Sequence, residues 1–140
     1  MNITFQFDCT DIDWDAAAAM LTEGLGPRDP EELRTAFENS GVVCFAFDGD
    51  HLVGLGRALT DGAYQAAVYD LCLLPPYRKQ GLGGMILDQI MRRAKARTTI
   101  LYSVPGKEGF YARHGFRPMK TAMALYAERA GEMAEQGYIE

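Results

Sequence analysis

The spacing of hydrophobic and polar positions changes several times along the chain, and each change marks an expected element. Apolar and polar residues alternate over 3–7, as in a short β-strand. Two segments with helical punctuation follow at 11–25 and 30–40. Asp29 can cap the second helix, and Pro30 can occupy its first position, where a missing N–H costs nothing. The N-terminal part is therefore expected to be one strand followed by two helices.

Three consecutive strands are expected in the middle of the chain. The sequence VVCFAFDGDHLVGLGRALTD has two apolar runs joined by the turn sequence DGD at 48–50. A second turn signal at Asp61 and Gly62 precedes the long run 64–74. Short connections of this kind join antiparallel neighbours, so the three strands should form a meander.

A helix over 81–96 should follow the meander and cross to a further strand. At 100° per residue its apolar residues fall in one half of the helical wheel, namely Leu82, Ile86, Leu87, Ile90, Met91 and Ala94. The next apolar run, TTILYSV at 98–104, is expected to pair in parallel with the strand before the helix. A short helix ending near Gly115, a last strand at 119–127 and a terminal helix from Glu128 complete the prediction.

This order of elements predicts an α+β fold of three layers, with a mixed, largely antiparallel sheet between helices on both faces. A chain of 140 residues has the usual size of one domain, so a single domain over 1–140 is expected. The net charge of −5 disfavours nucleic acid, which needs a broad basic surface. No signal sequence is visible and no run approaches ~20 apolar residues, so we expect a cytoplasmic protein with no membrane partner.

The three cysteines, Cys9, Cys44 and Cys72, are an odd number at wide spacing. No CxxC pair or neighbouring histidine accompanies them, so no metal site is expected. Cys44 and Cys72 lie inside apolar runs, which is typical of buried thiols in a reducing compartment. A catalytic thiol at Cys72 is the alternative, although neither His51 nor His114 is an evident partner base.

The sequence YRKQGLGG at 77–84 joins the third strand of the meander to the following helix. A sharp turn at the start of a helix leaves backbone N–H groups without internal acceptors, and the helix dipole adds positive charge there. Glycines allow positive φ and let a ligand approach the backbone. Because Arg78 and Lys79 add donors and charge, the segment predicts a phosphate or pyrophosphate site. A glycine-rich connection with solvated cations is the alternative.

Two other phosphate motifs do not fit this segment. A Rossmann fingerprint needs a third glycine where the chain has Ile86, and a P-loop needs a Lys-Ser or Lys-Thr pair after the glycines. The sequence LCLLPPYRKQGLGG instead resembles the acetyl-CoA signature of the GNAT superfamily of N-acetyltransferases, in which an apolar strand and a proline precede [RQ]-x-x-G-x-[GA]. FYARHGF at 110–116 resembles that family's second signature, and the expected elements follow the family fold over nearly the whole chain.

The resemblance implies a small single-domain N-acetyltransferase of unassigned substrate, which uses acetyl-CoA as cosubstrate and no metal. Backbone groups at 71–73 would bind the pantetheine arm and the acetyl carbonyl, and Tyr111 would protonate the departing thiolate. Many relatives carry Asn seven residues before this tyrosine; here the position is Val104, and the neighbouring Ser103 could substitute. The implied cofactor-binding residues are Leu71, Cys72, Leu73, Arg78, Lys79, Gln80, Gly81, Leu82, Gly83, Gly84 and Ser103.

Acetyl transfer to an amine requires a neutral nitrogen, a stabilised carbonyl oxygen and protonation of the leaving thiolate. An alkylamine of pKa ~10.4 is neutral about once in ~2,500 molecules at pH 7, so a general base should help. Asp70, next to the expected oxyanion donors, is the candidate catalytic base; pairing with Arg57 is the equal alternative, and Tyr69 or Asp61 could serve instead. Tyr111 has a phenol suited to protonating a thiolate, or else is a core aromatic.

Two functions of different classes therefore remain. The first is direct transfer of an acetyl group to a primary amine in a ternary complex, and the alternative is a non-catalytic acyl-CoA-binding or sensor domain. The expected partner is a small-molecule amine, and the acidic composition leans toward a cationic one. Dimers are common in the family, and the sequence is compatible with a homodimer.

Four basic residues lie at or just after the end of the 81–96 helix. They either contact the outer phosphate of the coenzyme or form a solvated helix end: Arg92, Arg93, Lys95 and Arg97.

Overall fold

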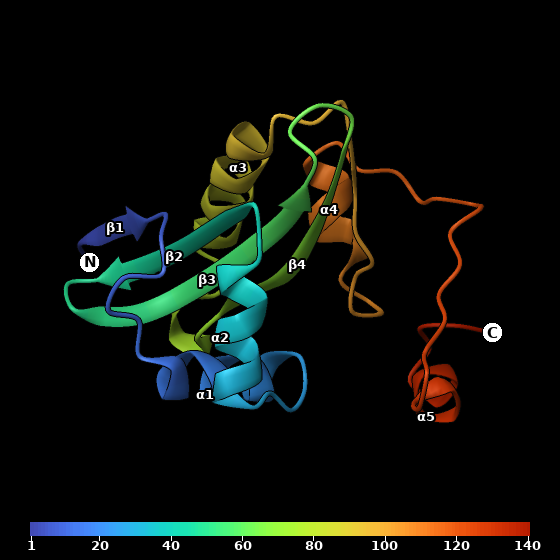
Figure 1. Ribbon diagram of the computed structural model, residues 1–140, viewed down its shortest axis with the longest axis horizontal. Helices are drawn as coiled ribbons and strands as arrows, with labels where there is room; N and C mark the ends of the chain where they lie inside the picture. Colours follow the sequence, from blue (N-terminus) through green and yellow to red (C-terminus); the bar gives the residue numbers. More distant parts are fainter. The chain divides into compact units, whose positions relative to one another are not determined.

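A mixed β-sheet organises the first 101 residues of the chain. The computed structural model describes all of residues 1–140 and divides them into two compact units, Met1–Leu101 and Tyr102–Glu140 (Figure 1). The sheet belongs to the first unit and has the strand order β1-β2-β3-β4-β5. Its strands are β1 (Ile3–Gln6), β2 (Val42–Asp48), β3 (His51–Thr60), β4 (Gln65–Leu73) and β5 (Thr98–Ile100).

The strand pairing confirms the predicted fold class. Antiparallel ladders join β1 to β2, β2 to β3 and β3 to β4, as consecutive strands with short turns should pair. Only the β4–β5 ladder is parallel, and it follows the crossover helix α3 (Leu82–Ala94). The result is the α+β arrangement of a mixed, mainly antiparallel sheet with helices that the sequence predicts.

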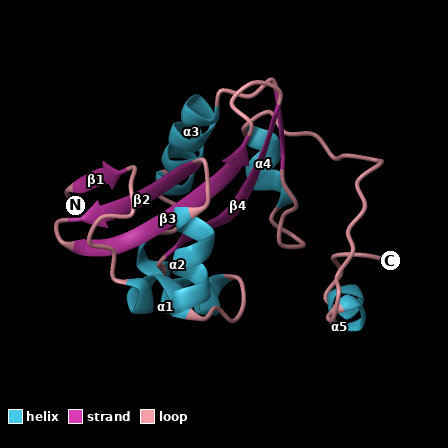
Figure 2. Ribbon diagram, viewed as in Figure 1, coloured by secondary structure: helices cyan, strands magenta, loops and turns pink.

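Helices cover both faces of this sheet, as Figure 2 shows. α1 (Trp14–Gly24) and α2 (Pro30–Glu38) pack on one face, where Phe37, Phe45 and Leu55 are among the buried core residues. The Phe37 and Phe45 rings lie 5.3 Å apart between their centroids, and Trp14 packs against both. On the other face α3 buries the apolar side predicted from its periodicity, with only Met91 half-buried: Leu82, Ile86, Leu87, Ile90 and Ala94.

Side-chain caps fix where the first two helices begin. The Asp13 carboxylate accepts the N–H of Ala16 at 3.1 Å, and the Asp29 carboxylate accepts the N–H of Glu32 at 2.9 Å. Pro30 occupies the first turn of α2, as expected. These caps satisfy N–H groups that a helix leaves without internal acceptors. The start of α2 agrees with its predicted cap, whereas α1 begins at Trp14, three residues after the start expected from the sequence.

The second unit, Tyr102–Glu140, contains two short helices, α4 (Glu108–Arg113) and α5 (Ala130–Glu135). Two expectations were wrong here. The strand predicted over 98–104 ends at Ile100, and the N–H of Lys107 instead bonds the Val104 carbonyl to close a turn through Pro105 and Gly106. The strand predicted over 119–127 does not form. The apolar residues that suggested it, Met123 and Leu125, are each 96% exposed and pair with no strand.

Candidate functional site

The connection from β4 to α3 builds a row of backbone donors. After Leu73 the chain passes through a single 3₁₀ turn, Pro75–Tyr77, and enters α3 at the N-cap residue Gly81. No side chain caps this helix, and the first intrahelical bond runs from the N–H of Met85 to the Gly81 carbonyl at 3.2 Å. The N–H groups of the first helical turn therefore have no acceptor within the helix.

The conformation of this turn explains its glycines. Gly81 has φ +86° and Lys79 has φ +62°, both in the left-handed region. A Cβ placed on Gly81 would meet no atom within 4 Å, so its backbone can be approached closely. The predicted residues Leu82, Gly83 and Gly84 supply the first helical turn. Free N–H groups combined with the positive end of a helix dipole make this turn suited to an anion such as a diphosphate.

The side chains of the turn are less free than the sequence suggests. Arg78 Nε donates to the Leu73 carbonyl at 3.1 Å, and its Nη2 pairs with the Glu23 carboxylate of α1 at 2.6 Å. Gln80 donates to the Pro76 carbonyl at 2.8 Å, while Lys79 is exposed. Arg78 thus braces the turn against β4 and α1, and its direct contact with a phosphate stays a prediction.

β4 has a free edge that leads into this turn. Its parallel ladder with β5 contains only the pairs from Gln65↔Thr98 to Ala67↔Ile100. Beyond Ala67, no strand pairs with β4 on the side away from β3, and this stretch includes the predicted residues 71–73. Backbone groups on such an edge can bond an extended ligand as a neighbouring strand would.

A β-bulge reshapes β4 within this free stretch. Leu55 pairs with Cys72 and Arg57 pairs with Tyr69, so the single intervening residue of β3 faces two residues of β4. One of these two, Asp70, has φ +60°. A bulge interrupts the regular ladder and re-aims nearby backbone groups, and bulges are over-represented next to active sites.

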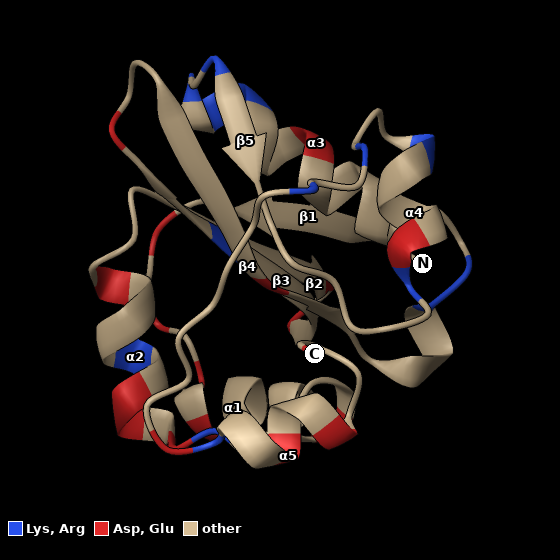
Figure 3. Ribbon diagram, turned by 90° about the vertical axis from the view of Figure 1, so that its right-hand side faces the viewer, with Lys and Arg blue, Asp and Glu red and all other residues tan.

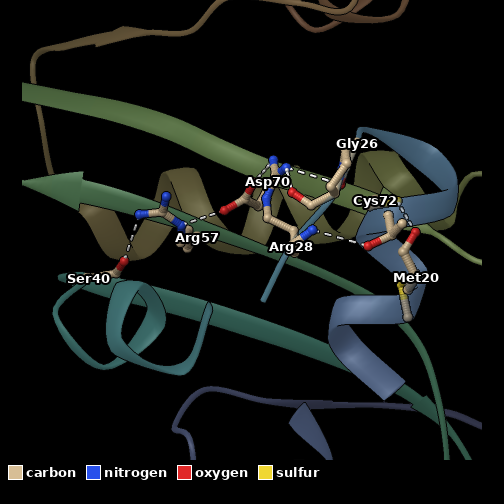
Figure 4. Close-up of polar contacts among 9 residues, drawn as sticks. Met20, Gly26, Arg28, Ser40, Arg57, Asp70 and Cys72 are labelled. Atoms are coloured by element: carbon tan, nitrogen blue, oxygen red, sulfur yellow. Dashed lines mark hydrogen bonds and ion pairs between the residues drawn. The ribbon is translucent and has the colours of Figure 1, made fainter. Parts of the chain in front are cut away.

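The carboxylate of Asp70 is held by two arginines (Figure 4). Arg57 Nε donates to one oxygen at 2.7 Å, and Arg28 Nη2 donates to the other at 3.1 Å. The Asp70 side chain is only 8% exposed. The pairing with Arg57 that the sequence suggested as an alternative is therefore present. The role of Asp70 as a general base stays a prediction, and both of its oxygens already accept a hydrogen bond.

Sequence reasoning missed Arg28 in this cluster. It lies in the loop between α1 and α2, at a separation of 42 residues from Asp70. Its Nη1 also donates to the Gly26 and Pro27 carbonyls at 3.1 Å. A single arginine in a loop carries no periodicity or motif, so nothing in the sequence distinguishes it from a solvated cation.

Cys44 and Cys72 are buried thiols, while Cys9 is partly exposed. Cys72 Sγ lies 3.6 Å from the Met20 carbonyl, and a Cβ on Gly24 would approach the same sulfur to 2.6 Å. Burial raises the pKa of Cys72 and raises that of Cys44 to about 12. The reactive form of a thiol is the thiolate, so the alternative of a catalytic Cys72 loses support. No group of three or more histidine, cysteine or acidic side chains is arranged to hold a metal ion.

Two predicted site residues belong to the second unit. Tyr111 lies on α4, where its ring contacts Phe110 and Phe116 at centroid distances of 5.0 and 5.9 Å. The Ser103 hydroxyl donates to the Val104 carbonyl at 2.6 Å. The contacts of Tyr111 and Ser103 with a bound coenzyme stay predictions.

Basic residues gather at the end of α3 and the start of β5 (Figure 3). Arg93 lies over the Phe7 ring at 3.3 Å from its centroid, and Arg97 lies over Tyr64 at 5.1 Å. Cation–π contacts of this kind orient guanidinium groups without consuming their hydrogen-bond donors. The outer-phosphate contact proposed for these cations stays a prediction. No helix of the chain has the length and hydrophobicity needed to traverse a lipid bilayer.

Comparisons with known proteins identify the family of the chain. Residues 39–118, more than half of the chain, match the family model described as an acetyltransferase (GNAT) domain. "Serotonin N-acetyltransferase 2, chloroplastic" of Oryza sativa subsp. japonica is 33% identical over 116 residues, which cover 76% of this chain and 58% of that protein. "Uncharacterized N-acetyltransferase ycf52" of Pyropia yezoensis is 27% identical over 100 residues, covering 66% and 58%. The chain thus spans a little over half the length of these curated relatives.

Solved structures show the same architecture. A GNAT-family acetyltransferase of Streptococcus pneumoniae TIGR4 superposes with a TM-score of 0.76 at 26% identity, covering 91% of this chain and 98% of that one. The family model includes β4, the glycine turn and the second signature at 110–116, which are the features that the sequence singled out. The chain belongs to the GNAT acetyltransferase family.

Proposed function

We propose that this chain is an acetyl-CoA-dependent N-acetyltransferase, which moves an acetyl group to a primary amine by direct transfer in a ternary complex. One observation carries the proposal: the free edge of β4 leads, through the short connection that contains the 3₁₀ turn, to the uncapped N-terminus of α3. This arrangement suits a ligand with an extended polar arm that ends in a diphosphate. Coenzyme A has that shape, and its acetyl thioester supplies an activated acyl group.

The residues present fit such a ligand. The turn from Arg78 to Gly84 offers backbone N–H groups for the diphosphate, and Gly81 leaves room for close approach. Backbone groups of Leu71–Leu73 on the free edge would bond the arm and the acetyl carbonyl. A backbone N–H directed at that carbonyl oxygen would stabilise the charge that develops on it during transfer.

The proton transfers fall to side chains. Tyr111 would donate its phenolic proton to the leaving sulfur, since a phenol of pKa ~10 suits a thiolate of similar basicity. The attacking amine must lose a proton before or during attack. Asp70 supplies the carboxylate of the bulge, but two guanidinium groups occupy its oxygens. A water molecule that relays the proton to solvent is therefore our preferred route for the amine.

Two features bear on the alternative function, acyl-CoA sensing without turnover, which the comparisons do not favour. Both oxygens of the candidate base accept hydrogen bonds from arginines. Val104 also stands where many relatives have the Asn that contacts the coenzyme arm. The two functions differ in one measurable respect, which is release of free thiol in the presence of an amine.

Several classes of amine are candidates for the acetyl acceptor. One relative is named a serotonin N-acetyltransferase, so arylalkylamines join polyamines, amino acids and aminoglycosides in the test panel. Within the first unit, an open surface hollow of about 390 Å³ lies beside the segment where β4 pairs with β5. Leu59, Ala67 and Ile100 line it, and an acceptor with an apolar body would suit these walls.

The test begins with binding and then measures turnover. Calorimetry and thermal shift with acetyl-CoA and CoA should show binding, with about 2.7 kcal/mol of stabilisation at 100 times the dissociation constant. Free-thiol release with the amine panel then separates the enzyme from the sensor. Tyr111→Phe should lower turnover while acetyl-CoA binding is retained, and Tyr64→Phe, on an exposed tyrosine, serves as its control. Absence of binding at millimolar coenzyme would refute the proposal.

A further inference from the structure

The ion-pair cluster at the bulge of β4 joins three separate parts of the fold. Arg57 comes from β3, Arg28 from the loop between α1 and α2, and Asp70 from the bulge itself (Figure 4). At 8% exposure, the Asp70 side chain is the most buried of the three, against 15% for Arg57 and 31% for Arg28. We propose that Asp70 is a positioning residue, whose clamped carboxylate sets the shape of the bulge and fastens the α1–α2 loop to it.

The backbone of Asp70 needs such support. Its φ of +60° lies in the left-handed region, which side chains other than glycine enter only at a free-energy cost. Residues remain in this region when the surrounding structure holds them there. Two ion pairs to one carboxylate, at 2.7 and 3.1 Å, provide that restraint. Loss of either pair should therefore alter the bulge, although the backbone ladder on both sides of it remains.

Both arginines are themselves fixed, so the clamp is anchored at each end. Arg57 lies over the Phe37 and Tyr69 rings at 5.8 and 5.2 Å from their centroids, and its Nη1 donates to the Ser40 hydroxyl at 3.2 Å. This places a rigid donor on the β3 side of Asp70. The position of Asp70 relative to β3 is thereby set by packing as well as by charge.

On the other side, Arg28 organises its own loop. Its guanidinium donates to the Gly26 and Pro27 carbonyls, and its backbone N–H donates to the Thr22 hydroxyl at 3.2 Å. The Arg28–Asp70 pair links this folded loop to β4. The bulge and the loop should therefore move together when the pair is broken.

The same geometry argues against Asp70 as the proton acceptor. A general base must lie within hydrogen-bond reach of the proton that it removes. Each Asp70 oxygen already accepts one guanidinium hydrogen bond, and at 8% exposure little of the carboxylate is open to an incoming amine. In the proposed enzyme, on which this inference rests, the carboxylate acts through the backbone: it directs the amides at 71–73 toward the acyl group.

A double-mutant cycle with Asp70→Asn and Arg28→Gln tests the inference in the full chain. If Asp70 positions the strand, either substitution should lower kcat by roughly three- to thirtyfold. The double variant should be no worse than the poorer single one, because Arg28→Gln removes one of the two ion pairs that Asp70→Asn already weakens. Acetyl-CoA affinity should fall less than kcat, because the turn from Arg78 to Gly84, which would hold the diphosphate, is not part of the cluster. Arg34→Gln removes an exposed ion pair with Glu38 and serves as the matched control.

Two measurements distinguish a positioning role of Asp70 from a merely structural role and from a role as general base. The pH dependence of kcat/KM should keep its shape in Asp70→Asn, and Arg28→Lys should restore part of the activity lost in Arg28→Gln. In ¹H–¹⁵N spectra, Arg28→Gln should shift the amides of residues 69–73, although these lie about 40 positions away in the sequence. This spectral test needs no substrate and no foldable Asp70 variant.

The outcomes distinguish this inference from the proposed function. If Asp70→Asn abolishes the acidic limb of the pH profile, which reports the group that must be deprotonated, while Arg28→Gln retains wild-type activity, Asp70 is the general base and the inference is wrong. Unchanged amide shifts at 69–73 in Arg28→Gln would equally overturn it. If the wild-type chain binds no acetyl-CoA, the proposed function itself fails, whatever the spectra of the variants show.

Discussion

Gly81 offers the sharpest test of whether the turn from Arg78 to Gly84 binds a diphosphate. Its substitution changes the preferred backbone conformation without a steric clash. Gly81→Ala adds a methyl group that would meet no atom within 4 Å, but the residue must keep φ near +86°. The left-handed conformation costs a non-glycine residue roughly 1–2 kcal/mol. At about 3–4 °C per kcal/mol for a domain of this size, the melting temperature should fall by about 3–8 °C.

Acetyl-CoA binding should fall by more than this loss of stability explains. If the turn relaxes toward negative φ, one N–H group no longer faces the diphosphate. A hydrogen bond to a charged group is worth about 1.5–3 kcal/mol, so the dissociation constant should rise roughly 10- to 150-fold. Calorimetric titration of the folded variant with acetyl-CoA and with CoA measures this change, and differential scanning calorimetry measures the stability.

Gly62→Ala is the matched control. Gly62 has φ +75° and open space where a Cβ would be added, but it lies in the hairpin between β3 and β4. It should lose a similar amount of stability and keep wild-type affinity. Wild-type affinity in Gly81→Ala would refute the assignment of the diphosphate to this turn. Equal losses of affinity in both variants would instead attribute the effect to stability alone.

The remaining predictions concern the core, the thiols and the acid limit of stability. Phe37→Ala removes a ring that is 1% exposed and should lower the free energy of unfolding by about 3–5 kcal/mol, measured in urea. Cys44 and Cys72 should resist Ellman's reagent at pH 8 until the protein is denatured, because burial raises the pKa of both thiols; rapid reaction of either in the native state would contradict their placement. A backbone N–H and the Tyr77 hydroxyl lower the pKa of Asp48, so its stabilising contribution should be present at neutral pH and be lost as the pH falls through that lowered value. Tyr77→Phe should raise the Asp48 pKa in a ¹H–¹³C titration, and an unchanged value would show that the hydroxyl does not act on the carboxylate.

The GNAT family supplies the fold and the general chemistry, while the acceptor depends on features particular to each chain. In this chain, the hollow lined by Leu59, Ala67 and Ile100, beside β4, is our candidate for such a feature. Variants of these three residues, assayed with a panel of amines, test it.

Local patterns in the sequence determined most of the helices, the meander and the glycine turn at 77–84. Caps, turns and amphipathic periods depend on residues only a few positions apart, so Asp29 and Pro30 mark a helix start by their spacing alone. The glycine turn was predictable for the same reason. Its required φ values and its missing side-chain cap follow from the residues at 79–84 themselves.

Only the tertiary structure decided which strands and side chains meet. The apolar run at 119–127 has the composition of a strand, but a strand exists only where a neighbour accepts its hydrogen bonds. The bulge at Asp70 and its pair with Arg28, 42 residues away, depend on how a loop packs against a sheet. The ion pair between Arg78 and Glu23 likewise could not be predicted without knowing where α1 packs. Such contacts bring distant segments together, and no pattern of neighbouring residues encodes them.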